Sequence, residues 1–297
     1  MSAVLTATDI QVSFLKESQK TIFSKERQQV LRGIDLETNE GECLGIIGES
    51  GSGKSTLGRV LAGLLPPDSG KVVIEGIDIY DRSHRKQAAL RHNLAIVFQD
   101  YTSSANPRFR VSSIIGESLR VLEKTGERID RKARVAELLE QVGLPADFAG
   151  RYPHELSGGQ LQRVCIARAI ALRPRVILLD EAISSLDAST QIQVMDLLMD
   201  LRKRHGLSYL FITHDLTSIT YLCDRVLFFH NGSVVERVDQ MDRIGFIRND
   251  YARRLLESVM GIGVTGGLPT QEQNSLQPAR TSIVDLPLHT QQQIRAV

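Results

Sequence analysis

The strongest constraint on the fold of this chain is a glycine-rich segment, Gly-Glu-Ser-Gly-Ser-Gly-Lys-Ser, that runs from Gly48 to Ser55. The stretch Glu42–Ile47 before it has the composition of a buried strand, and we expect a helix from Lys54 to about Leu65 after it. A strand, a glycine turn and a helix in this order are the context in which the pattern G-x-x-x-x-G-K-[ST] forms a phosphate-binding loop. The segment therefore predicts a nucleoside triphosphate site at the end of a strand.

Each residue type in this segment has a chemical purpose. Glycines let the backbone curl so that its N–H groups face the phosphates, and the helix N-terminus adds partial positive charge. Lys54 should reach the β- and γ-phosphates, and Ser55 should bind Mg²⁺. The alternative is a purely structural glycine turn, and the motif alone does not separate a kinase from a GTPase or a transporter. The residues expected to contact the nucleotide here are Gly48, Glu49, Ser50, Gly51, Ser52, Gly53, Lys54, Ser55 and Thr56.

A second apolar stretch ends in two carboxylates. Its residues Val176–Leu179 have the character of a buried strand, and Asp180 and Glu181 follow directly. Ligands of open α/β sheets gather at the carboxyl ends of the strands. We therefore expect Asp180 to hold Mg²⁺, directly or through water, and Glu181 to orient and deprotonate an attacking water. An acidic helix cap is the alternative, and the presence of the phosphate loop argues against it.

The downstream half of the chain alternates strands with helices. Strands are expected at Arg175–Asp180, Tyr209–Thr213 and Val226–Phe229, with helices at Thr190–Arg204 and Leu216–Leu222 between them. Such alternation predicts an α/β fold with a mainly parallel sheet and helices on both of its faces.

Other segments are expected to add to this core. Strands at Thr8–Leu15 and Val30–Glu37 should flank a polar hairpin loop, Lys16–Gln29, and further strands are expected at Lys71–Glu75 and Leu94–Phe98. From about residue 100 to residue 172 the pattern becomes helical, because apolar residues recur at helical spacing. The residues that share one helix face in this insertion are Val135, Leu138, Leu139 and Val142.

The C-terminal part divides at about residue 261. Asp250–Met260 should form a closing helix, whereas residues 261–297 are rich in Gln, Thr, Ser, Gly and Pro and predict a mostly disordered tail.

Composition excludes several other classes of protein. The formal net charge of +1 gives no global basic field for nucleic acid or an anionic membrane. Cys43, Cys165 and Cys223 stand alone in apolar stretches, which is typical of core residues rather than of a metal site or a disulfide framework. We see no signal peptide and no apolar run of the roughly 20 residues that span a bilayer. If the protein serves transport, another chain must supply the channel.

The string Leu156-Ser-Gly-Gly-Gln160 lies just before an expected helix and about twenty residues ahead of the acidic strand. Here the chain resembles the ATP-binding-cassette (ABC) ATPases, because this string is the signature of that family. Further matches follow in the family's order: Gln99 resembles its glutamine loop, Ser184–Asp187 its dimer-contact loop, and His214 its switch histidine. The resemblance covers about residues 4–260. It implies a RecA-like, mainly parallel sheet core, an N-terminal antiparallel β subdomain and a helical insertion at about residues 100–172.

The resemblance also implies roles for the matched residues. The signature helix end would face the γ-phosphate of the opposite subunit, so two cassettes, identical or different, must pair to hydrolyse ATP. Gln99 would sense Mg²⁺ or water, and His214 would bond the γ-phosphate and hold the water of Glu181. Phe14 would stack on the adenine, with Phe23 as the alternative for this role and a place in the core as the alternative for Phe14. The residues expected to reach the partner's nucleotide are Ser157, Gly158, Gly159, Gln160 and Asp187.

Within the family, Tyr101–Arg108 and Asp250–Val259 resemble the nickel and peptide importer branch. Ala182 and Leu161–Cys165 resemble the second ATPase of a nickel importer. This implies an importer of nickel or a nickel chelate; a dipeptide or oligopeptide importer is the alternative. The implied partners are two permease subunits and a periplasmic or extracellular substrate-binding protein, with the chain at the cytoplasmic face of the inner membrane.

The rival classes lack support in the sequence. A soluble ABC ATPase that acts on nucleic acid would carry two cassettes or a long coiled coil, and an exporter often carries a fused membrane domain. A regulatory cassette without activity would be expected to lose Glu181, His214 or the signature, and all three are intact.

Overall fold

The computed structural model describes residues 2–15, 26–81, 83, 92–100 and 104–260. The expected stacking alternative Phe23, part of the loop Lys16–Gln29, residues 101–103 and the tail 261–297 lie outside the described residues. In the described part of the chain, no helix is both long enough and apolar enough to cross a membrane.

A six-stranded sheet forms the centre of the molecule, in the order β10-β9-β3-β8-β7-β6. All neighbours in it are parallel except β10, which runs antiparallel to β9. The strands are β3 (Cys43–Ile47), β6 (Leu94–Phe98), β7 (Val176–Asp180), β8 (Ser208–Thr213), β9 (Arg225–His230) and β10 (Ser233–Val238). The predicted mainly parallel α/β core is confirmed.

Both faces of this sheet are buried, because successive side chains of a strand point to opposite sides. In β7, Val176 and Leu178 join one apolar cluster, and Ile177 and Leu179 join the other. The first cluster includes α1 (Lys54–Leu61) and the N-terminal sheet. The second includes the helices α7 (Ala188–His205) and α8 (Leu216–Leu222) and the helical insertion.

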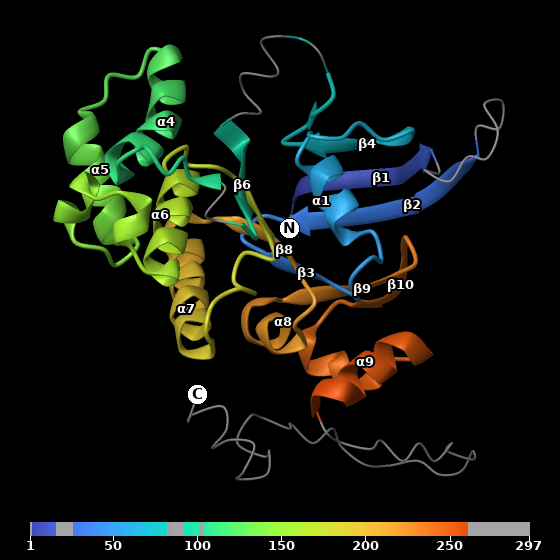
Figure 1. Cartoon of the computed structure of the whole chain (residues 1–297). Helices are drawn as coiled ribbons and strands as arrows, with labels where there is room; N and C mark the ends of the chain where they lie inside the picture. Colours follow the sequence, from blue (N-terminus) through green and yellow to red (C-terminus); the bar gives the residue numbers. More distant parts are fainter. Residues whose placement is uncertain (1, 16–25, 82, 84–91, 101–103, 261–297) are drawn as a thin grey trace, which may run out of the picture.

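The second sheet is antiparallel and has the order β2-β1-β4-β5. Its strands are β1 (Ala3–Leu15), β2 (Arg27–Asn39), β4 (Ser69–Ile74) and β5 (Ile77–Asp78). Both long strands extend beyond their predicted bounds, because their pairing continues to Ala3↔Asn39 and Leu15↔Arg27. The N-terminal antiparallel subdomain implied by the family resemblance is present (Figure 1).

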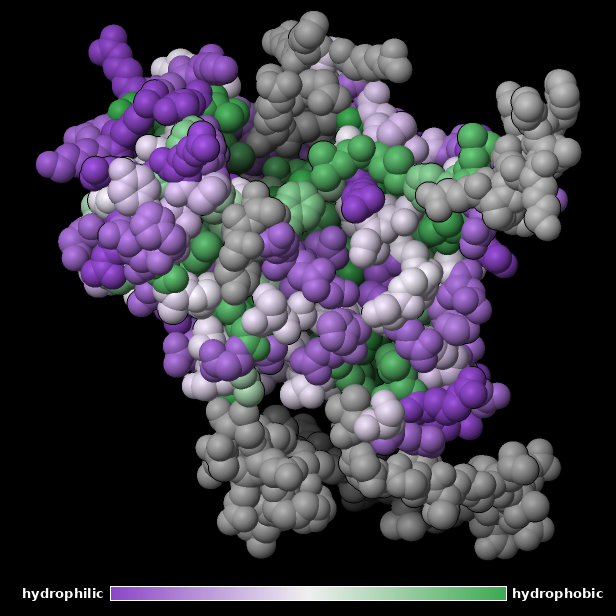
Figure 2. Space-filling view, in the orientation of Figure 1, coloured by the Kyte–Doolittle hydropathy of each residue, from purple (hydrophilic) through white to green (hydrophobic). Residues whose placement is uncertain are grey.

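The helical insertion lies to one side of the main sheet, at the left of Figure 1. Its buried face carries the four residues predicted from their spacing, which are at most 3% exposed. Figure 2 shows its outer surface as mostly hydrophilic. Its elements are α4 (Val111–Lys124), α5 (Arg131–Gln141), the 3-10 turns η1 (Ala146–Gly150) and η2 (Pro153–Glu155), and α6 (Gly158–Ile170).

The structure also differs from the prediction at the end of α1 and after β9. Helix α1 ends at Leu61 instead of about Leu65, because Gly63 adopts a left-handed conformation (φ 72°) and its N–H and that of Leu64 bond back into the last turn. The chain after β9 also continues into β10, η3 (Met241–Phe246) and α9 (Asp250–Met260), of which only the last was predicted.

Candidate nucleotide-binding and catalytic site

The candidate site lies along one edge of the main sheet, where the parallel strands β3, β8, β7 and β6 end side by side. The register places Phe98 of β6 opposite Asp180 of β7, and Asp180 opposite Ile212 of β8. The predicted residues follow these strand ends directly. The sheet therefore brings together the phosphate loop, His214, the pair Asp180 and Glu181, and Gln99.

The loop after β3 leaves the first turn of α1 open. The N-cap residue Gly53 has φ 107° and provides no side-chain hydrogen bond to the helix. Lys54 is only 4% exposed, and its Nζ donates to the carbonyl oxygens of Gly48 (2.6 Å) and Glu49 (2.7 Å). Burial lowers the pKa of Lys54, and the charges of Glu181, Asp180 and Glu49 oppose that shift. A buried cation thus lies at the uncapped N-terminus of α1, as a phosphate site requires.

Asp180 has the environment of a cation ligand. Its Oδ1 is buried and, among the described residues, has no hydrogen-bond partner. Burial raises the pKa of Asp180 to about 6; the charge of Glu181 adds to the shift, and Arg59 and Lys54 oppose it. The described residues contain no group of three or more His, Cys, Asp and Glu side chains placed to hold a metal. Mg²⁺ commonly binds one or two carboxylates together with substrate phosphates, so this single orphaned carboxylate oxygen fits it.

Glu181 has a strained backbone for a residue that is not glycine, with φ 47°. Its N–H donates to the carbonyl oxygen of Ile212 at 2.8 Å, which fixes the residue against the end of β8. Its Oε1 lies 3.5 Å from Nδ1 of His214. Left-handed non-glycine residues persist where the surroundings hold them and cluster at functional sites. The carboxylate of Glu181 and the imidazole of His214 therefore lie beside each other at the carboxyl edge of the sheet.

Gln99 and Phe14 lie nearer the surface. Gln99 is exposed directly after β6. Phe14, near the end of β1, is 43% exposed, so its ring is accessible for stacking on a planar ligand.

The signature segment lies apart from the phosphate loop of its own chain (Figure 1). Ser157 is the N-cap of α6, and it is exposed. Its Oγ accepts from the N–H of Gln160 at 3.3 Å, and its N–H donates to Oε1 of that glutamine at 3.0 Å. A Cβ at Gly159 would lie 2.3 Å from Cγ2 of Thr190. Glycine there allows α6 to approach the first turn of α7.

The segment between Glu181 and α7 holds the predicted dimer-contact residues. Ser184 Oγ donates to the carbonyl oxygen of Glu181 at 2.9 Å. Asp187 is the N-cap of α7 and accepts from the N–H and the hydroxyl of Thr190, at 3.0 and 2.7 Å. These bonds lower the pKa of Asp187. Within its own chain, Asp187 therefore has a capping function.

Sequence reasoning missed two contacts, one at this site and one at the opposite end of β3. Tyr251 of α9 reaches the phosphate loop, where its hydroxyl oxygen accepts from the N–H of Glu49 at 2.9 Å. Cys43 and Cys223 are buried with their Sγ atoms 3.5 Å apart, although 180 positions separate them in the sequence. Periodicity identifies the buried face of a segment but not its distant partner, so neither contact had a sequence signal.

The fold and the strand-end site define a nucleotide-binding cassette. A sequence model of the ABC transporter family, described as "ABC transporter", matches residues 31–184. The chain belongs to this family.

Three curated relatives show its place within the family. A putative peptide import ATP-binding protein of Brucella abortus is 48% identical over 236 residues, which is 77% of this chain and 70% of that protein. The oligopeptide transport ATP-binding protein OppF of Lactococcus lactis is 39% identical, over 89% of this chain and 83% of that protein. The metal-staphylopine import system ATP-binding protein CntF of Staphylococcus aureus is 40% identical, over 86% of this chain and 98% of that protein.

Solved structures show the same cassette. A dimeric ATP-binding cassette in a post-hydrolysis state, bound to ADP and Pi, superposes with a TM-score of 0.67 at 29% identity and covers 78% of this chain and 97% of that one. The ABC cassette fold with its phosphate-loop core is thereby confirmed.

Proposed function

We propose that this chain is the ATP-hydrolysing subunit of an ABC importer. It would work as one of two paired cassettes beneath two permease subunits, supplied by a periplasmic or extracellular substrate-binding protein. The proposal rests on the row of parallel strand ends. This row brings the phosphate loop, the carboxylate of Glu181 on its strained backbone, and His214 to one edge of the sheet. The names of two relatives, which are ATP-binding proteins of a peptide import and a metal-staphylopine import system, support the direction of transport.

The proposed chemistry follows from the side chains at that edge. The N-terminal amides of α1 and the ammonium of Lys54 bind the β- and γ-phosphates. Ser55, Asp180 and Gln99 would hold Mg²⁺, which supplies positive charge for the phosphate oxygens when it is bound. Glu181 accepts a proton from the attacking water, and His214, beside Oε1 of Glu181, keeps the water and the γ-phosphate in line. Phe14 stacks on the adenine.

The site needs a second chain to be complete. Ser157–Gln160 would bind the γ-phosphate held by the partner, and Asp187 would lie at the contact between the two cassettes. The separation of α6 from α1 supports this arrangement, because a helix end so far from its own phosphate loop does not serve the same nucleotide (Figure 1).

The proposed domain organisation has one ATPase domain at residues 4–260, with a helical subdomain at about residues 100–172 and a separate tail at 261–297. We place the chain as a peripheral subunit at the cytoplasmic face of the inner membrane. The groove that receives the permease would lie between the helical subdomain and Gln99.

For the cargo we propose nickel or a nickel chelate, and the metal-staphylopine relative favours a metal complex. The relative from Brucella abortus and OppF favour a peptide as the second candidate. The test is uptake in cells that lack this gene, with radioactive nickel, alone and with added chelators, and with labelled dipeptides and longer peptides. Complementation by the wild type should restore one cargo and Glu181→Gln should not; restoration by both would contradict the coupling of transport to hydrolysis.

The loop before α4 is the proposed contact with the permease. Asn106 Oδ1 accepts from the N–H of Arg108 at 3.0 Å, so the loop forms a tight turn. Arg110 is engaged within the chain: its guanidinium carbon lies 5.2 Å from the centre of the Tyr152 ring, and its Nε donates to the Tyr152 hydroxyl at 3.3 Å. Arg108 is therefore the cleaner residue to test for docking.

We expect Arg108→Glu to reduce permease binding and uptake more than the basal ATPase activity of the separate subunit. Reversing the charge would repel carboxylates on the permease and leave the residues of the nucleotide site unchanged. Uptake and basal hydrolysis would be measured in the same variant, with Lys132→Glu on the exposed side of α5 as the control. Intact uptake, or an equal loss of both activities, would contradict this role.

A further inference from the structure

One peptide group of the phosphate loop is held at both ends. The peptide between Gly48 and Glu49 donates its N–H to the hydroxyl oxygen of Tyr251 at 2.9 Å. Its carbonyl oxygen, on Gly48, accepts from Nζ of Lys54 at 2.6 Å. The N–H and the C=O of a planar trans peptide point in opposite directions. A hydroxyl from the C-terminal helix and the ammonium of the phosphate-binding lysine thus hold opposite sides of one rigid plane.

Tyr251 is itself firmly placed. It is 9% exposed, and its ring lies against the imidazole of His230, with ring centres 4.0 Å apart and a tilt of 31°. Asn249 Oδ1 accepts from the N–H groups of Tyr251 (3.0 Å) and Ala252 (3.3 Å), which begins α9 at this residue.

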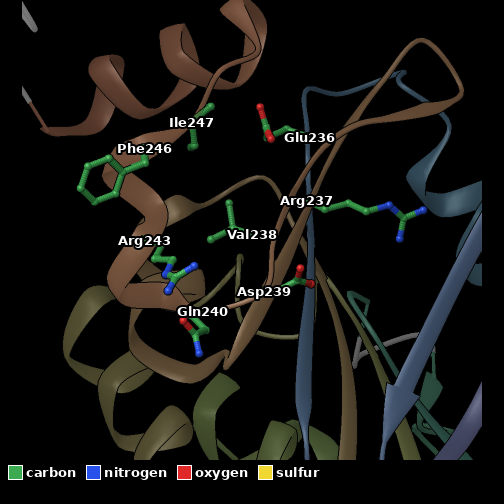
Figure 3. Close-up of a pocket in the computed structure, with 8 residues that line it drawn as sticks. All are labelled: Glu236, Arg237, Val238, Asp239, Gln240, Arg243, Phe246 and Ile247. Atoms are coloured by element: carbon green, nitrogen blue, oxygen red, sulfur yellow. The ribbon is translucent and has the colours of Figure 1, made fainter.

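The start of α9 is tied in turn to β10. Oε2 of Glu236 accepts from the N–H groups of Arg248 and Asn249 at 3.0 and 2.8 Å. Figure 3 shows Glu236 and Ile247 on one side of a cavity of about 470 Å³, with Gln240 and Arg243 on the other. The carboxylate of Glu236, which is partly buried, therefore anchors the start of α9.

The other side of the phosphate loop rests on the turn between β9 and β10. A Cβ at Gly48 would lie 2.1 Å from the carbonyl oxygen of Phe229, so the two backbones are in close contact there. The N–H of Gly232 donates to the carbonyl oxygen of Ser52 at 2.9 Å. The 48–49 peptide thus lies between the end of β9 and α9, and Tyr251 provides the acceptor for its N–H.

We infer that Tyr251 is a positioning residue for ATP binding, acting on Lys54 through the 48–49 peptide plane. By accepting from Glu49 N–H, it directs the Gly48 carbonyl toward Lys54 and so sets where the ammonium stands when the phosphates arrive. The inference rests on the proposed function. Residue 251 lies beyond the segment that the family model matches, residues 31–184. Helix α9 therefore supports the nucleotide site from beyond the segment that the family model matches.

The test is Tyr251→Phe, which removes the hydroxyl and keeps the ring that packs on His230. Loss of one neutral hydrogen bond corresponds to roughly a 2- to 10-fold change in an equilibrium constant. We expect the ATP Kd and KM to rise by that factor in the full chain, with kcat within about 2-fold. The Glu49 amide should exchange with solvent faster, since its acceptor is gone. Tyr221→Phe is the matched control, because Tyr221 is exposed and its hydroxyl bonds Asp196, away from the site.

A melting temperature that falls while Kd and KM stay at the wild-type values would overturn the inference, because Tyr251 would then only stabilise the fold. Faster exchange of the Glu49 amide with no change in ATP affinity would overturn it too. Lys54→Ala in the same assays separates this outcome from failure of the proposed function. If Lys54→Ala loses ATP affinity and Tyr251→Phe does not, the inference alone fails; if neither does, the nucleotide site itself is wrongly assigned.

Discussion

Two helix N-termini of this chain are proposed to bind phosphate, and they are built differently. Helix α1 begins at Gly53, whose left-handed backbone carries no capping side chain, and its Lys54 is buried. Helix α6 begins at Ser157, which is exposed and forms a reciprocal capping box with Gln160. The first end keeps its amides open, and the second covers an amide with its own side chains.

This difference indicates which of the two helix N-termini can bind a nucleotide without a second cassette. Open amides and a buried ammonium are costly unless an anion satisfies them, so α1 is prepared for a nucleotide in the single chain. A serine cap contributes about 1 kcal/mol to the stability of a helix, so the N-terminus of α6 is stable without a bound phosphate. That phosphate would come from the partner cassette.

Ser157→Arg tests this contrast with the largest expected effect. We expect ATP hydrolysis by the assembled complex to fall to background, because a long charged side chain prevents closure on the partner's nucleotide. ATP binding to the separate subunit should remain close to the wild-type value. Ser157→Ala is the control, since it removes the cap without the bulk. Collapse of ATP binding in the single subunit would mean that α6 serves its own nucleotide.

Glu181→Gln tests the catalytic step alone. Removal of a general base lowers the rate by about 10²–10⁴-fold, so steady-state hydrolysis should fall by that range. ATP binding and pairing of the cassettes should persist, which size-exclusion chromatography with ATP would detect. Glu140→Gln, an exposed change of the same kind on α5, serves as the control. Near-normal hydrolysis would remove Glu181 from its proposed role.

Lys54→Ala tests the N-terminus of α1, and we expect it to weaken ATP binding, the step before hydrolysis. A hydrogen bond to a charged group contributes about 1.5–3 kcal/mol, so the ATP Kd of the single subunit should rise roughly 10- to 150-fold. Calorimetric titration would measure it, with Lys203→Ala on the exposed part of α7 for comparison. Unchanged affinity would contradict the phosphate-loop assignment.

Asp180→Asn has the smallest expected effect and concerns stability. The pKa of Asp180 is raised from its usual 3.8 to about 6, so the folded chain binds this proton more tightly than the unfolded chain. The ionised carboxylate therefore destabilises the fold above about pH 6, and the cost fades as the pH falls toward 4. Without nucleotide, the asparagine variant should be more stable by about 1–3 kcal/mol near pH 8.

Thermal unfolding of both forms across this pH range would measure the difference. A gain in the free energy of unfolding that stays constant with pH, or a loss at every pH, would contradict a carboxylate that is destabilised by burial at position 180.

Much of the sheet could be predicted from the sequence, because buried parallel strands give short apolar runs with little ambiguity. The bounds of β6 match the prediction, and those of β3 and β7 differ by one residue. Since parallel strand ends meet at one edge, placing Gln99, Glu181 and His214 after such strands also predicted their proximity.

Other features depend on information that local pattern does not hold. Strand β10 is an edge strand of intermediate burial with weak alternation, so its sequence resembles a loop. The ends of β1 and β2 are set by their mutual pairing. The contact of Tyr251 with Glu49 joins residues 202 positions apart, and only the assembled fold brings them together.

The packing of Gly159 against Thr190 means that variants at two positions of the signature would have different effects on the protein. The Thr190 hydroxyl is bound by Asp187, so its methyl group does not swing aside for a new side chain. We expect Ser157→Arg to spare the folded subunit and disable the assembly, whereas even Gly159→Ala would push α6 and α7 apart inside one chain. Two residues of a single five-residue signature would therefore yield different phenotypes: one variant would fold without hydrolysing ATP, and the other would be a loss of folded protein.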